Sequence, residues 1–143
     1  MKFNQNDGGR AAAGYKGFTG DCATRALAIA AEMPYQEAYD LVNKFSKDEK
    51  PSKRRNGKSS ARTGVHTHTF RKIMDHLEWR WTPLMFIGQG CAVHMDADEL
   101  PGGRLICRVS KHFTAVIDGV INDSHDCSRE GKRCVYGYWA KDN

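Results

Sequence analysis

The residue with the clearest capacity for chemistry is Cys22, in the segment Phe18–Met33 (FTGDCATRALAIAAEM). Small apolar residues recur at helical spacing after it, and Asp21 is a typical N-cap residue. We therefore predict a helix that begins at Cys22. Unpaired N–H groups and the helix dipole stabilise a thiolate at that position and lower its pKa. Free cysteines are also common core residues, so position alone leaves a reactive thiolate and a buried structural thiol both open.

A base for this thiol can be derived from a predicted hairpin. His112 opens the apolar stretch HFTAVI, and Asp118-Gly119 is a strong signal for a two-residue turn. Side chains alternate between faces along a strand, so His112 and Asp123 share one face as diagonal neighbours. A loop of odd length would place Asn122 there instead. His125 is a rival base, which we interpret as an exposed histidine at a strand end.

Two motifs carry a resemblance to a known family. GDCATRALAIA, followed much later by KHFTAVIDGVINDSHD, resembles the papain-like cysteine peptidase superfamily, in particular the compact bacterial and phage members related to bacteriocin-processing peptidases. The resemblance implies Cys22 as nucleophile, His112 as base and Asp123 as orienting group. It covers both ends of the chain but not residues 47–100. It also implies a phage or mobile-element origin and a host or viral protein as target.

The chain departs from that family at the oxyanion donor. The resemblance implies a glutamine shortly before the nucleophile, but the nearest upstream glutamine is Gln5. Thr19, backbone N–H groups or a folded-in Gln89 are the candidate replacements. The loss of one such donor costs on the order of 100-fold in rate.

The elements that must position these residues fall into two halves. Three helices are predicted in the first half, over Cys22–Met33, a stretch opened by Pro34, and Val65–Trp79. Five short strands follow in the second half: LMFIG, RLICRV, HFTAVI, VINDS and CVYGYWA. We interpret residues 1–18 as an irregular lead-in. The order predicts one α+β domain over residues 1–143. The resemblance implies a papain-like arrangement, in which the helices pack on an antiparallel meander.

The segment Lys47–Gly64 interrupts the helices and concentrates basic residues. The 143-residue chain has a net charge of +5, and Lys47–Arg62 is a block rich in Lys and Arg. We interpret it as a mobile basic insertion that could meet an acidic partner surface. It has no interleaved aromatic residue on which bases could stack, so nucleic-acid binding ranks as the third functional alternative.

Five cysteines without a secretory signal predict reduced thiols and a cytoplasmic location. No apolar run has the length of a membrane span. Only a weak signal for zinc comes from the spacing of Cys91, His94, His125 and Cys127. We therefore expect neither a metal nor a cofactor.

The sequence thus predicts a cysteine peptidase, a thiol hydrolase that acts on an amide or isopeptide bond of a protein or peptide substrate. Deamidation of glutamine and acyl transfer use the same site and stay open. The alternative is a catalytically weak or inactive scaffold that binds and inhibits a host factor.

Overall fold

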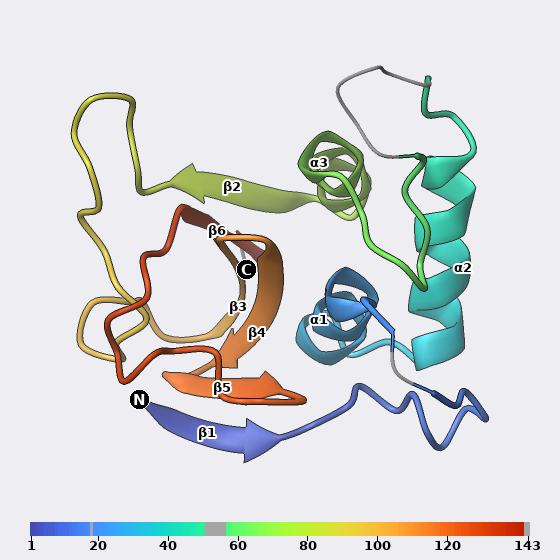
Figure 1. The fold of residues 1–143 in the computed structure, drawn as a ribbon, viewed down its shortest axis with the longest axis horizontal. Coiled ribbons are helices and arrows are strands. Elements are labelled where there is room, and N and C mark those ends of the chain that lie inside the picture. The colour runs from blue at the N-terminus through green and yellow to red at the C-terminus, as the bar shows by residue number, and fades with distance from the viewer. Residues whose placement is uncertain (18, 51–56, 142–143) are drawn as a thin grey trace.

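The computed structural model describes residues 1–17, 19–50 and 57–141, and that part of the chain has an α+β architecture (Figure 1). Its helices are α1 (Cys22–Ala30), α2 (Tyr35–Ser46) and α3 (Thr67–His76). Its strands are β1 (Lys2–Gln5), β2 (Trp79–Pro83), β3 (Arg104–Val109), β4 (His112–Ile117), β5 (Val120–Asp123) and β6 (Gly137–Lys141). The predicted α+β class is confirmed.

The strands form one mixed sheet in the order β1-β5-β4-β3-β6-β2. β3, β4 and β5 make the predicted antiparallel meander, and β6 and β2 extend it beyond β3. β1 lies parallel to β5 at the opposite edge. The prediction of an irregular lead-in is therefore wrong for Lys2–Gln5, whose short polar sequence becomes a strand only because β5 offers it an edge.

The first predicted strand is also displaced. Glu78 has a φ of 64°, which ends the helical segment, and Trp79 already belongs to β2. The stretch LMFIG, residues 84–88, is an exposed loop after β2 rather than a strand. Leu84 still packs against the core, but Met85, Phe86 and Ile87 are exposed, so the apolar run by itself was misleading.

Helix α1 is buried along its length because its residues are small. Every residue from Ala23 to Ala30 is buried, and the helix packs between β4 and α2 (Figure 1). The core on this face of the sheet includes Phe113, Ala115 and Trp139. This packing brings the N-terminus of α1 to the end of the sheet where β4 begins.

The other face of the sheet has its own core. Cys107, Val109 and Val116 point to this face, and the segments around Met95 and Cys127 cover them. The sheet thus separates two apolar layers, and the start of β4 lies at the edge of both.

The flanks of the basic segment are packed parts of the fold. Ser59 N donates to the buried Glu49 carboxylate at 2.8 Å, and Ala61 is fully buried against α1, where its carbonyl accepts from Thr24. These flanks are not a mobile insertion, whereas residues 51–56 lie outside the described residues.

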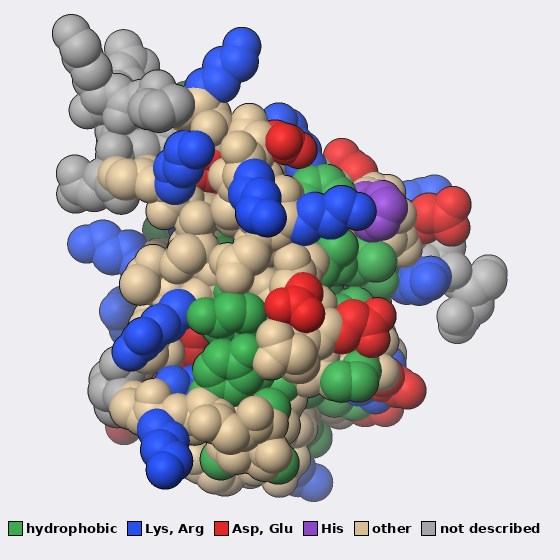
Figure 2. Space-filling model, turned by 90° about the vertical axis from the view of Figure 1, so that its right-hand side faces the viewer, with side chains coloured by type: hydrophobic (Ala, Val, Ile, Leu, Met, Phe, Trp, Pro, Cys, Tyr) green, Lys and Arg blue, Asp and Glu red, His purple; other side chains and the backbone are tan. Residues whose placement is uncertain are grey.

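On the face that α2 presents, Lys and Arg side chains alternate with acidic and apolar ones (Figure 2).

Candidate active site

Cys22 is the first residue of α1 and is half-buried. Asp21 occupies the N-cap position, as predicted, but its side chain makes no capping hydrogen bond. The N–H groups of the first turn lack helical partners because of their position. The Cys22 sulfur therefore lies where a negative charge is stabilised.

The Asp21 side chain has a structural task instead. Its carboxylate accepts hydrogen bonds from Arg25 and, at 2.6 Å, from the Tyr35 hydroxyl, and Arg10 lies 3.3 Å away. Asp21 is almost fully buried. This network ties the start of α1 to α2 and to the lead-in segment, and so fixes the position of Cys22.

The hairpin places His112 as the sequence predicts. Asp118 and Gly119 both have positive φ, 48° and 78°, as a tight two-residue turn requires. The resulting register brings His112 Nε2 within 2.6 Å of Asp123 Oδ2. Asn122 points to the other face, where its Oδ1 accepts from Asn4, so it is not available to orient the imidazole.

Asp123 is held in the charged form. Its carboxylate is buried, but it bonds His112, accepts from Ser124 N at 2.6 Å, and lies 3.3 Å from the Arg25 guanidinium. Burial favours the neutral acid, and these partners outweigh it, so the pKa of Asp123 lies well below its usual range.

Cys22 and His112 favour opposite charges. Burial alone would raise the pKa of the Cys22 thiol, but a hydrogen bond to His112, the charge of that ring and the Phe113 N–H bring the pKa below its usual value. Burial would lower the pKa of His112, but the bond to Asp123 and bonds to the Cys127 and Cys22 thiols raise it. The arrangement therefore favours a thiolate beside an imidazolium.

These side chains open onto a cleft of about 520 Å³. α1, the β3–β4 turn, the start of β4 and the residues after β5 all contribute to it. Its lining residues include Thr19, Gly20, Cys22, Arg25, Thr63, Gly64, Val65, Arg108, Lys111, His112, Ser124 and His125. A substrate in this cleft could reach the thiol and the imidazole at the same time.

Of the two predicted oxyanion donors, the structure brings only Thr19 to the cleft. Thr19 Oγ1 is buried and has no hydrogen-bond partner within the described ranges. Gln89 lies in the exposed loop after β2 and is not a lining residue. That loop is anchored at the far end of β2, so Gln89 does not fold in as a replacement donor.

The rival base lies close by. The His125 ring centroid is 5.2 Å from that of His112, and Ser124 Oγ lies 3.3 Å from His125 Nδ1. His125 is exposed, and no bond to a carboxylate is recorded for it in the described chain. His112 has the carboxylate partner and is the better base.

One group near the site has metal-ligand chemistry. The ligand atoms of His112, Asp123 and Cys127 all lie within 4.8 Å of one another, and all three residues are buried. However, His112 and Asp123 already bond each other directly, so an ion shared by them would have to separate that pair. The direct bond fits an acid–base pair better than a metal centre.

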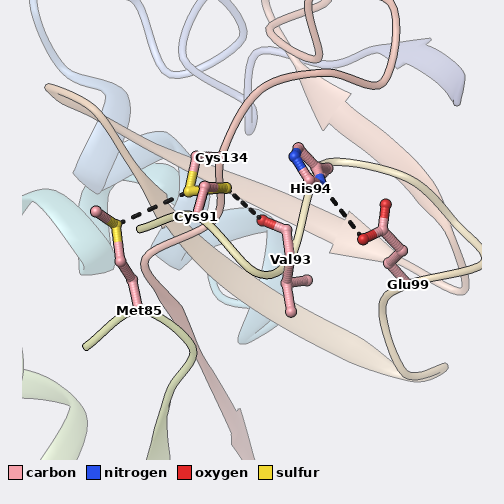
Figure 3. The surroundings of a disulfide bond; sticks show 6 residues. All are labelled: Met85, Cys91, Val93, His94, Glu99 and Cys134. Atoms are coloured by element: carbon pink, nitrogen blue, oxygen red, sulfur yellow. Dashed lines mark hydrogen bonds and ion pairs between the residues drawn. A yellow bond between two sulfur atoms is a disulfide. The ribbon is translucent and has the colours of Figure 1, made fainter. Parts of the chain in front are cut away.

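The prediction of five reduced thiols is wrong for Cys91 and Cys134. Cys91 and Cys134 form a disulfide, and His94 pairs with Glu99 (Figure 3). The backbone around Val93 pairs with the segment around Cys134, which brings the two cysteine Cα atoms to 5.8 Å. The sequence spacing of 43 residues gave no sign of this pairing.

Two arginines at the site, Arg25 and Arg108, were not predicted from the sequence. Arg25 links Asp21 to Asp123, and Arg108 lines the cleft from β3. Arg25 is the one charged residue of CATRALAIA, and Arg108 is the second arginine of RLICRV, where it follows three apolar residues. A buried charge requires a partner, so that pattern was the available signal.

None of the helices in the described part of the chain is both long and apolar enough to cross a bilayer. No family model, curated protein or solved structure matches this chain.

Proposed function

We propose that this protein is a cysteine-dependent acyl-transfer enzyme of papain-like type, which cleaves an amide or isopeptide bond. The observation that carries the proposal is that Cys22 and His112 line one cleft, while the buried Asp123 bonds His112. Covalent acyl transfer needs a nucleophile, a base beside it and a carboxylate that orients the base.

The proposed reaction begins after the Cys22 thiol has transferred its proton to His112, which leaves a thiolate beside an imidazolium. The thiolate attacks the scissile carbonyl carbon, and the carbonyl oxygen takes up negative charge. The Cys22 N–H and the Thr19 hydroxyl are the donors proposed for that oxygen. The tetrahedral species then collapses, the C–N bond breaks, and the His112 imidazolium gives its proton to the leaving amine.

Deacylation reverses these roles. His112 accepts a proton from water as the water oxygen attacks the thioester carbonyl. The C–S bond breaks, the acid is released, and Cys22 returns as the thiolate beside protonated His112. Asp123 stays ionised throughout and stabilises His112 whenever it is protonated, at the start of acylation and during deacylation.

A binding scaffold without turnover is the competing proposal. It is favoured by the observation that no glutamine lines the cleft in the part of the chain that the structure describes. The two proposals differ in whether the Cys22 thiol is activated, because a scaffold needs no thiolate.

The test is the rate of Cys22 alkylation by iodoacetamide against pH, with the modified residue identified by peptide mass. We expect a plateau that extends well below pH 8. His112→Ala should shift the profile upward towards an ordinary thiol. His125→Ala is the matched control and should leave the profile in place, because no carboxylate hydrogen-bonds His125 in the described residues.

An ordinary thiol profile that His112→Ala does not change would refute the enzyme and favour the scaffold. If the ion pair is present, Cys22→Ala should abolish cleavage of a peptide library analysed by mass spectrometry.

A further inference from the structure

The acidic side chains that line the cleft, Asp7 and Asp21, already have partners within the protein. Asp21 is paired with Arg10 and Arg25. The Asp7 carboxylate accepts hydrogen bonds from the backbone N–H groups of loop residues next to it. A substrate in the cleft therefore meets no free carboxylate on these two residues.

The cations are not balanced in the same way. Arg108 and Lys111 both line the cleft, and neither makes an ion pair with an acidic side chain in the described ranges of the chain. Arg108 is half-buried. Withdrawing a cation from water is unfavourable unless an anion lies close to it, so this arrangement favours an anionic group of a substrate beside Arg108.

Arg108 is held in a fixed orientation beside the reacting atoms. It lies opposite Phe113 in the β3–β4 register, and its guanidinium carbon is 4.3 Å from the centre of that ring. Phe113 directly follows His112, and the charge of Arg108 interacts with that of Cys22. Stacking occupies the flat face of the guanidinium and leaves its N–H edges free to bind a carboxylate.

Lys111 adds a second positive charge at the rim. It belongs to the two-residue turn between β3 and β4, with a φ of 57°, and its side chain is exposed. The turn precedes His112 directly. The two cations thus lie on the same side of the cleft as the base.

We propose that the cleft selects substrates that carry a carboxylate next to the scissile amide, and that Arg108 binds this carboxylate while Lys111 attracts it. This inference deepens the proposed function and rests on it. The carboxylate has two sources of the same chemistry: the side chain of an Asp or Glu residue within a chain, or the free α-carboxylate at a chain end.

Electrophilic probes that react with Cys22 test this without a known substrate. The first pair is a blocked peptidyl vinyl sulfone with Glu or with Gln next to the reactive group. The thiolate adds to the β-carbon of the vinyl group, and the α-carbon takes up a proton. The second pair is N-iodoacetylglycine and N-iodoacetylglycinamide, in which the thiolate displaces iodide. The first pair reports a side-chain carboxylate and the second a terminal one.

We expect the acidic member of one pair to label Cys22 about tenfold faster or more, since hydrogen bonds to charged groups contribute about 1.5–3 kcal/mol. The pair that shows the preference identifies the source. Arg108→Gln should abolish the preference, so that the acidic and neutral members of a pair label Cys22 at equal rates. Added salt should reduce the preference for the acidic probe, because it screens the charges. Arg71→Gln is the matched control, because Arg71 also stacks on an aromatic ring, at 5.8 Å from Trp81, but does not line the cleft.

Equal rates for both members of both pairs would overturn the inference. So would an Arg108→Gln variant that slows acidic and neutral probes alike, because Arg108 would then support only the thiolate. The iodoacetamide pH profile is independent of these ratios. An ordinary thiol profile with a retained acidic preference would refute the enzyme and keep the anion site, whereas an activated thiol without preference would do the reverse.

Discussion

At the scale of single residues, Asp123 couples the candidate site to stability. It is buried and bonds His112, Arg25 and the Ser124 N–H. Its removal would leave two buried cationic groups without their shared partner. The surroundings of Asp123 therefore require its side chain to be negatively charged.

We predict that Asp123→Asn lowers the free energy of unfolding by about 3 kcal/mol at pH 6. The folded pKa of Asp123 is lowered, so its contribution is present above about pH 3.9 and lost as the pH falls further. The folded pKa of His112 is raised, so its contribution is complete below about pH 6.5 and lost as the pH rises through the folded value.

Urea unfolding at several pH values measures this difference. The gap between wild type and Asp123→Asn should be widest between about pH 4 and 6.5. A gap that is the same at pH 3, 6 and 9 would contradict the coupled pair.

A second prediction at this scale concerns Thr19. Thr19→Val replaces the hydroxyl with a methyl group of similar shape, so it should lower the turnover rate on the order of 100-fold. Stability should be unchanged or slightly higher, because the buried hydroxyl has no partner in the described structure. Thr19→Ser is the control and should keep most of the activity. Full turnover by Thr19→Val would exclude Thr19 as a donor.

At the scale of elements, the join between β6 and β2 depends on Gly137. It lies opposite Pro83 at the end of the pair, and a Cβ there would overlap the Trp81 ring and approach Thr82 O to 2.8 Å. Trp81 in turn packs on Trp139, with ring centroids 4.3 Å apart. Because Gly137 has no side chain, it leaves room for the Trp81 ring at this edge of the sheet.

We predict that Gly137→Ala destabilises the protein by about 2–3 kcal/mol, as overpacking against a rigid neighbour does. Gly102→Ala is the control, because its Cβ would meet only Asp118 Oδ1 at an ordinary 3.6 Å. Thermal unfolding compares the two. Equal melting temperatures would show that β2 can move away from β6 without cost.

At the scale of the whole molecule, the disulfide joins the loop after β2 to the segment before β6. Cys91 and Cys134, whose bond is drawn in Figure 3, are 43 residues apart in sequence, and neither lines the cleft. A cross-link of this span restricts the unfolded chain without touching the site.

We predict that the double change Cys91→Ser and Cys134→Ser lowers the free energy of unfolding by about 2–4 kcal/mol, while the pH profile of Cys22 alkylation is unchanged. Reductant should lower the melting temperature of the wild type and not that of the double variant. An intact mass that shows five free thiols in the native, unreduced protein would refute the bond.

The sequence by itself determined the local features of the site. The helix that begins at Cys22 follows from residues within a few positions of it, and the pair of His112 with Asp123 follows from one turn and strand alternation. Such features depend on backbone geometry over short distances, which residue types specify directly. The α+β class followed from the same periodicities.

Only the tertiary structure decided which distant segments meet. β1 beside β5, Cys91 bonded to Cys134, Arg25 against Asp123, and Gln89 kept away from the cleft are all pairings across long stretches of chain. No local periodicity encodes them, because they arise when whole elements bury their apolar faces against one another. Packing α1 on β4 is the step that brings Cys22 to His112.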